Sequence, residues 1–309
     1  MGVKCAGADS GIAVFELNRY LKERAEFVQA ALDRVVIAGA GADGRLFEAM
    51  RYSLLGGGKR LRPILALAAC EAVGGPRQAA LGLACAVEMI HTYSLIHDDL
   101  PCMDNDDLRH GRPANHKVYG DAMATLAGDA LLTDAFRVLA RSALDGVPIE
   151  RVLATIAELS EAAGSAGMVG GQVIDILSER KRLSLEELKL LHSKKTGAMF
   201  RVSVVGGGRL GGATDVQLER LDQYARALGL AFQVVDDLLD VEATTEQMGK
   251  RTGKDDAAGK NTFPALMGLD RSHAYARELA IAAQAAIADF GAAAEPLRQI
   301  ANFVVERGR

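Results

Sequence analysis

Hydrophobic positions recur with a helical period along most of the chain. Between residues 17 and 35, apolar side chains return every three or four residues, as one buried helix face requires. These positions are Leu17, Leu21, Val28, Leu32 and Val35. A second stripe runs from Leu81 to Asp98 and turns polar toward its end, at His91 and Ser94. Each stripe predicts one helix.

Signals for helix ends support the same interpretation. Ser184 with Glu187, and Thr214 with Gln217, have the spacing of capping boxes that open helices. Only 7 prolines occur in 309 residues, and no strand-like alternation is sustained over several segments. We therefore expect an all-α protein of roughly ten to thirteen helices.

Glycine clusters divide the chain at residues 39–44, 56–58 and 206–208, but none has the flanking polarity of a long linker. We expect one domain over residues 1–309, with residues 1–15 as a candidate flexible segment. One weak internal repeat is visible, because an apolar helix ends in aspartates near residue 98 and another does so near residue 236.

Composition narrows the class of protein. A hydrophobic fraction of 49% with 25% charged residues is typical of a globular chain, and a net charge of −4 argues against a nucleic-acid binder. The four cysteines stand far apart, which favours a reducing cytoplasm over a disulfide framework or a zinc site. No uninterrupted apolar run reaches the ~18 residues of a membrane span. We expect a cytoplasmic protein without such a span.

One glycine motif suggests a different class of enzyme. The sequence GAGADG at 39–44 has the G-x-G-x-x-G spacing of dinucleotide-binding loops, which would make the protein an NAD(P)-binding oxidoreductase. That motif needs a preceding strand and an acidic residue about 20 positions later. Val35 and Val36 instead continue a helical period, and residues 59–64 read KRLRPI. A turn between two helices is therefore favoured.

Two aspartate clusters are the strongest chemical signal. The first reads HDDLPCMDNDD at 97–107, where Pro101 should end the helix and let Asp104 fold back toward Asp98 and Asp99. In the second, Asp236 and Asp240 share a helix face with Gln233, and Asp237 lies beside them. Like charges ~4 Å apart repel by about 4 kcal/mol at an effective dielectric of ~20, so a cation is expected between them.

Magnesium and diphosphate fit these clusters. Mg²⁺ is usually held by a few carboxylates together with substrate phosphates. Basic residues that could hold phosphate occur beside the glycines and elsewhere along the chain. They are Lys59, Arg62, His91, Arg109, Lys195, Lys250, Lys254 and Lys260.

From about residue 45 to 270 the chain resembles the trans-isoprenyl diphosphate synthases. The motifs that carry the resemblance appear in the order of that family: SLLGGGKRLRP, HTYSLIHDDLPCMDNDDLRHG, LAGDALL, GGQVIDIL, KKTGAMF, FQVVDDLLD and GKNTFPAL. The first motif has the longer spacing of bacterial farnesyl and plant-type geranylgeranyl enzymes. The resemblance implies a helical homodimer with a deep central cavity in each subunit.

The resemblance also implies roles for individual residues. Six carboxylates would hold three Mg²⁺, with Mn²⁺ as a substitute: Asp98, Asp99, Asp104, Asp236, Asp237 and Asp240. Arg109, Lys195 and Lys254 would contact the allylic diphosphate, and Lys59, Arg62 and His91 would hold isopentenyl diphosphate. Thr196, Gln233 and Gln172 would place oxygen dipoles near the carbocation that forms when the allylic C–O bond ionises.

One position departs from the family. The family reads L-R-R-G after the first motif, whereas this chain has His110 between Arg109 and Gly111. The second arginine normally grips isopentenyl diphosphate, and histidine is shorter and only partly charged near neutral pH. We therefore expect a weakened, pH-sensitive site for isopentenyl diphosphate, which His110→Arg should improve at pH 8.

Product length depends on the helix that carries Asp98. Ser94, one turn before Asp98, is small enough to let a growing chain pass, and by resemblance an aromatic side chain at Tyr93 closes the pocket near a C15 product. We expect farnesyl diphosphate, with the C20 geranylgeranyl diphosphate as the alternative. A terpene cyclase is disfavoured, because its second motif is normally of N-D-x-x-[ST]-x-x-x-E type and this chain has DDLLD.

Overall fold

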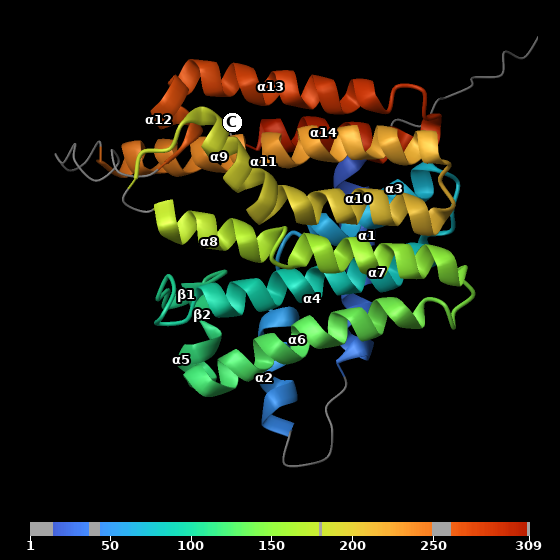
Figure 1. Cartoon of the computed structure of the whole chain (residues 1–309), viewed down its shortest axis with the longest axis horizontal. Coiled ribbons are helices and arrows are strands. Elements are labelled where there is room, and N and C mark those ends of the chain that lie inside the picture. Colours follow the sequence, from blue (N-terminus) through green and yellow to red (C-terminus); the bar gives the residue numbers. More distant parts are fainter. Residues whose placement is uncertain (1–14, 37–43, 179–180, 249–260, 308–309) are drawn as a thin grey trace, which may run out of the picture.

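The computed structural model describes residues 15–36, 44–178, 181–248 and 261–307 (Figure 1). This part of the chain contains fourteen α-helices, twelve of them eight residues or longer, which confirms the all-α prediction. They are α1 (Leu17–Val35), α2 (Gly44–Leu54), α3 (Leu61–Ala72), α4 (Leu81–Asp98), α5 (Asn115–Tyr119), α6 (Asp121–Arg141), α7 (Ile149–Ala163), α8 (Met168–Ser178), α9 (Leu185–His192), α10 (Ala198–Gly211), α11 (Asp215–Met248), α12 (Phe263–Met267), α13 (Leu269–Ala286) and α14 (Glu295–Glu306).

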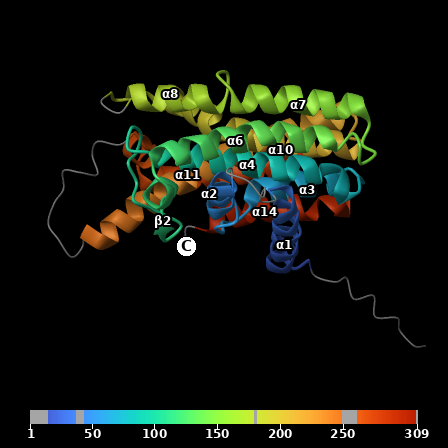
Figure 2. The same cartoon turned by 90° about the horizontal axis from the view of Figure 1, so that it is seen from below.

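Helix α4 lies inside the bundle and ends at the first aspartate cluster. It packs mainly against α6 and α3, and α10 packs against α3, α11 and α7. Figure 2 shows α7 and α8 as an outer layer over α6, α10 and α4. Eleven of the eighteen residues of α4 are buried, which is why its apolar stripe could be recognised in the sequence.

Helix ends formed where their sequence signals predicted them. The hydroxyl of Ser184 accepts the backbone N–H of Glu187 at 3.3 Å, and the Glu187 carboxylate accepts the N–H of Ser184 at 2.8 Å. Thr214 and Gln217 make the same reciprocal pair ahead of α11, with distances of 3.3 and 2.9 Å. Both capping boxes are confirmed.

A dinucleotide-binding loop would need a β-strand directly before GAGADG, and the structure has a helix there. Val35 is the last residue of α1, so the run before GAGADG is helical. Residues 37–43 lie outside the described residues. Because α1 rather than a strand precedes GAGADG, a dinucleotide-binding motif is disfavoured.

The third glycine cluster does not separate two elements. Residues 206–208 lie inside α10, where a Cβ on Gly207 would stand 2.2 Å from the carbonyl oxygen of Ala66 on α3. The glycines therefore serve close packing of two helices rather than a turn. Periodicity alone could not show this, because a turn and a tight helix crossing both select glycine.

Two local features had no prediction. Strands β1 (Leu108–Arg109) and β2 (Arg112–Pro113) form a small antiparallel hairpin. Its two turn residues, His110 and Gly111, have φ of 52° and 74°, the positive values that tight hairpin turns need. A π-helical turn also occupies Ser193–Gly197, between α9 and α10.

One segment passes a length and composition test for a membrane span. Residues 77–98 are long and apolar enough, which was not expected from the sequence, but 67% of the most apolar stretch of this segment is buried inside the protein. Since this segment contains α4, its apolarity is that of a core helix. It is weak evidence for a membrane span.

Candidate active site

A cavity of about 520 Å³ lies between the α2–α3 loop, α4 and the β1–β2 hairpin. It brings together five residues that the sequence assigned to substrate binding: Lys59, Arg62, His91, Arg109 and His110. Asp99, the buried member of the first acidic motif, also lines it. Phe232 of α11 and Arg307 after α14 contribute from the C-terminal half. The charged residues that line it are therefore mostly basic, with Glu88 and Asp99 as the two carboxylates among the described residues.

Arg60 anchors the loop that carries Lys59 to the neighbouring helices. The guanidinium of Arg60 forms a buried ion pair with Glu88 of α4, and it donates to the carbonyl of Leu54 at 2.7 Å and to Gln29 at 2.9 Å. Arg60 itself has a φ of 51°, a backbone conformation that residues other than glycine rarely adopt. These contacts determine where Lys59 and Arg62 enter the cavity.

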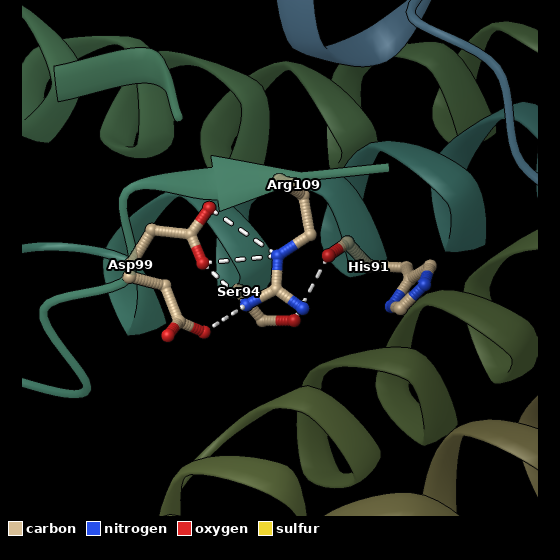
Figure 3. A network of polar contacts seen from close by, with 5 residues as sticks. His91, Ser94, Asp99 and Arg109 are labelled. Atoms are coloured by element: carbon tan, nitrogen blue, oxygen red, sulfur yellow. Dashed lines mark hydrogen bonds and ion pairs between the residues drawn. The ribbon is translucent and has the colours of Figure 1, made fainter. Parts of the chain in front are cut away.

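His91 presents a neutral imidazole to the cavity. Burial and the neighbouring Arg62 lower the pKa of His91 well below its ordinary value. Burial also lowers the pKa of Arg62, although Glu88 and Asp236 oppose that effect. Figure 3 shows Ser94 beside His91, with the Ser94 hydroxyl donating to the His91 carbonyl at 2.9 Å. A neutral imidazole can still donate one hydrogen bond to a phosphate oxygen.

Arg109 and Asp99 connect the cavity to the first acidic motif. Asp99 is only 2% exposed, and its carboxylate accepts three hydrogen bonds from the Arg109 guanidinium, two from Nε at 3.0 and 3.3 Å and one from Nη2 (Figure 3). Nη2 of Arg109 also donates to Asp106 at 3.1 Å. The N–H of Asp104 donates to the carbonyl of Asp98 at 2.8 Å, so the loop folds back as predicted.

Asp98 is held where a charged carboxylate is unfavourable. Burial raises the pKa of Asp98 to about 6, the nearby Lys195 lowers it, and Asp104 and Asp99 raise it further. Burial likewise raises the pKa of Asp104. A cation between these carboxylates would favour their charged form.

The π-helical turn places Lys195 and Thr196 opposite this motif. Lys195 forms an ion pair with Asp175 of α8 at 2.6 Å. The Thr196 hydroxyl donates to the side-chain oxygen of Gln233 at 3.0 Å, and Nδ1 of His192 lies 2.9 Å from the same oxygen. Gln233 is thereby fixed on α11, one turn before the second acidic motif.

The aspartates of the second motif point in different directions. Asp236 accepts from Arg307 at 3.1 Å, and burial raises its pKa. Asp237 accepts the backbone N–H of Phe263 at 2.9 Å and so interacts with the start of α12. Asp240 is exposed on α11. The predicted shared helix face of Asp236 and Asp240 is present, whereas Asp237 is turned toward α12.

Some predicted roles stay predictions. No group of three or more described acidic, histidine or cysteine residues is arranged to hold one metal ion. Gln172 lies partly buried on α8. Tyr93 is 6% exposed and meets the ring of His97 edge to face, with the centroids 5.6 Å apart. Lys250, Lys254 and Lys260 lie outside the described residues.

Four residues of the site had not been selected from the sequence. Asp175 is the one acid of α8, and Glu88 stands among apolar residues of α4, away from Asp98 at the helix end. That isolation was the signal that could have found them. Arg307 comes from the other end of the chain, so no local pattern points to it. Arg112 follows the hairpin turn and also lines the cavity.

Comparison with known proteins agrees with this geometry. Residues 43–295 match the Polyprenyl synthetase family. A dimethylallyltranstransferase of Fischerella ambigua (strain UTEX 1903) is 49% identical over 296 residues, covering 96% of this chain and 85% of that protein. A chloroplastic geranylgeranyl pyrophosphate synthase of Catharanthus roseus is 48% identical over 300 residues, covering 96% and 83%. The crystal structure of an FPP/GFPP synthase from Zymomonas mobilis has a TM-score of 0.85 at 40% identity, covering 94% of this chain and 98% of that one. The chain belongs to the polyprenyl synthetase family of trans-prenyltransferases.

Proposed function

We propose that this prenyltransferase condenses isopentenyl diphosphate head to tail with allylic diphosphates and releases geranylgeranyl diphosphate. The observation that carries the proposal is the cavity itself, in which Lys59, Arg62 and His91 stand next to an Asp99–Arg109 pair. Two diphosphates need two anion sites, one of them beside carboxylates. The chain length C20 takes its support from curated relatives at 48% identity that carry the geranylgeranyl name.

The carboxylates suit Mg²⁺, with Mn²⁺ as a substitute. Oxygen donors are what Mg²⁺ prefers, and it keeps waters and substrate phosphates, so a complete protein cage is not required. Burial raises the pKa of Asp98 to about 6, and Asp104 and Asp99 raise it further, so a cation at this place would offset the cost of the charged carboxylates. The proposed ligands of three metal ions are Asp98, Asp99, Asp104, Asp236, Asp237 and Asp240. Bound metal would neutralise the leaving diphosphate.

The protein side chains then have distinct tasks. Arg109, Lys195 and Lys254 would hold the allylic diphosphate as its C–O bond breaks heterolytically. Lys59, Arg62 and a neutral His91 would hold isopentenyl diphosphate so that its double bond faces the cation. The oxygens of Thr196, Gln233 and Gln172 would stabilise positive charge. The proton lost after bond formation goes to the released diphosphate, so no protein base is needed.

Farnesyl diphosphate remains the second candidate product. Tyr93 is a buried aromatic side chain on α4 near Asp98, the position from which we expected a C15 limit. Its ring packs on His97, whose Nε2 lies 3.0 Å from the carbonyl of Thr125 on α6. A tyrosine ring held in this way would close the pocket and stop growth of the prenyl chain at C15 unless the ring moves.

We also propose a homodimer in the cytosol. An apolar face on α7 and α8 is exposed on the outer layer of Figure 2, and a second copy of the chain would cover it. It consists of Leu153, Val169, Val173, Ile176 and Leu177. Cys70, Cys85 and Cys102 are free thiols, which is typical of a reducing compartment.

Product analysis tests the proposal. Purified protein is incubated with isopentenyl and dimethylallyl diphosphates and Mg²⁺, and the products are dephosphorylated and separated by chain length. A C20 alcohol is expected, with a C15 alcohol as the result for the second candidate. Both should disappear with EDTA and in Asp236→Asn. Absence of any prenyl product in the wild-type protein would contradict the proposed function.

A further inference from the structure

We infer that Arg112 is a further diphosphate-binding residue of the isopentenyl diphosphate site, in the place of the arginine that His110 replaces. The inference rests on the proposed function and adds one residue to its substrate site. It concerns a side chain that the sequence motifs left without a role.

The hairpin puts Arg109 and Arg112 side by side. They are directly paired across β1 and β2, and directly opposed residues of an antiparallel pair project from the same face. His110 and Gly111 form the turn between them, with positive φ at both residues. The second guanidinium on the face of Arg109 therefore comes from residue 112 rather than from residue 110.

The Arg112 guanidinium is held against the loop that carries Lys59. It lies over the ring of Tyr52, 4.1 Å from the centroid, and its Nη1 is 3.4 Å from the Tyr52 carbonyl. A Cβ built on Gly56 would stand 2.9 Å from that same nitrogen. Lys59 and Arg112 line the same cavity as His110, so the positive charges of the lysine and the arginine converge on one volume.

Arg112 also differs from Arg109 in its partners. Arg109 is engaged by Asp99 and Asp106, which ties it to the acidic side of the cavity. No carboxylate of the described residues lies within ion-pair distance of Arg112. Stacking on Tyr52 orients the planar guanidinium while leaving N–H groups for a bidentate contact with diphosphate oxygens. We therefore expect the Arg112 guanidinium to bind a substrate diphosphate rather than a protein carboxylate.

This assignment changes the expectation for His110. If Arg112 supplies the second guanidinium, it compensates for His110, and His110→Arg should have its largest effect on the Michaelis constant for isopentenyl diphosphate when Arg112 is absent. The same substitution should restore binding when Arg112 is removed.

Steady-state kinetics test the inference. In Arg112→Gln we expect the Michaelis constant for isopentenyl diphosphate to rise about tenfold, and that for the allylic diphosphate to stay within about twofold. Arg112→Lys should be intermediate, because it keeps the charge and loses the planar fork. His110→Arg added to Arg112→Gln should recover most of the loss. Arg141→Gln, an exposed arginine at the far end of α6, is the control.

Calorimetric titration of the full-length protein with isopentenyl diphosphate separates this inference from the proposed function. Weaker binding to Arg112→Gln than to wild type would support the inference even if no condensation were found. Equal binding, or equal losses for both substrates, would overturn it. Inorganic pyrophosphate is titrated in parallel, and an equal loss for it would show that Arg112 recognises the diphosphate group rather than the isopentenyl chain.

Discussion

Arg60 and Glu88 form an ion pair whose side chains are only 4% and 6% exposed. Arg60 precedes α3 in the loop of the substrate site, and Glu88 lies in the middle of α4. The pair therefore fixes a loop in an unusual backbone conformation onto the helix that ends in Asp98. Both residues are buried in the wall of the cavity and bind each other, so we expect the pair to affect substrate by positioning Lys59 and Arg62.

Glu88→Gln should destabilise the protein and loosen this loop. Removing one partner leaves a buried guanidinium without its counter-charge, which costs about 3 kcal/mol of unfolding free energy. The Michaelis constant for isopentenyl diphosphate should also rise by about tenfold, because Lys59 and Arg62 lose their fixed position. Urea denaturation and steady-state kinetics measure the two effects.

A matched control is available on the surface. Glu186 pairs with Lys189 at 2.8 Å, but its side chain is 81% exposed, so Glu186→Gln should change stability by less than about 1 kcal/mol. The Arg60→Met and Glu88→Leu double variant should regain much of the stability without recovering substrate affinity. Recovery of both would show that the pair has no positioning role.

The helices could be predicted because their signals are local. The stripe from Leu81 to Asp98, the two capping boxes and Pro101 each act within a few residues, and the structure agrees with all of them. The glycines of α10 were misread because the reason for them is Ala66 on another helix. Tertiary contacts of this kind leave no periodic pattern.

The candidate site was predictable as far as its motifs reached. Lys59 and His91 were selected because they stand in recognisable motifs, and both line the cavity. Glu88 and Arg307 were missed because they act through partners 28 and 71 residues away along the chain. Asp237 was grouped with Asp236 by spacing, whereas the N-terminus of α12 determines its orientation.

Tyr93→Ala should lengthen the product. The ring is buried on α4 and held edge-on by His97, so its removal opens a space comparable with several methylene groups along the helix. We expect the main alcohol to shift by at least one C5 unit. Chromatography of the dephosphorylated products measures the shift. Tyr20→Ala, at a similarly buried tyrosine on α1, should leave chain length unchanged. An unchanged product in Tyr93→Ala would mean that another side chain sets the limit.

Charges on the apolar face of α8 should separate the proposed dimer. Val173 and Leu177 lie one turn apart and are 50% and 64% exposed. A lysine at either position would have to be buried in the proposed dimer interface, which would disfavour association. The Val173→Lys and Leu177→Lys double variant should sediment as a monomer at micromolar concentration. Ile281→Lys, at a similarly exposed position on α13, should not change the mass. A wild-type monomer would contradict the dimer outright.

His91 should make the metal-free protein sensitive to acid. Its folded-state pKa is well below the ordinary value of 6.5, because burial and Arg62, His110, Arg60 and Arg109 disfavour a charged ring. The His91 imidazole therefore takes up a proton near pH 6.5 in the unfolded chain but not in the folded protein. Its contribution to the free energy of unfolding is fully present above that pH and is lost as the pH falls below it. Between pH 7.5 and pH 5.5 this loss amounts to about 1 kcal/mol.

His91→Gln should remove that part of the acid sensitivity. Urea denaturation in EDTA at the two pH values measures it as a smaller drop in unfolding free energy than in wild type. His273→Gln controls for loss of a histidine elsewhere, since His273 lies on α13 beside Glu242 with a ring 35% exposed. An equal drop in His91→Gln and wild type would mean that the folded protein accommodates a charged imidazole in the cavity. The neutral hydrogen-bond donor that we assign to isopentenyl diphosphate would then be an imidazolium, and binding of that substrate would weaken as pH rises.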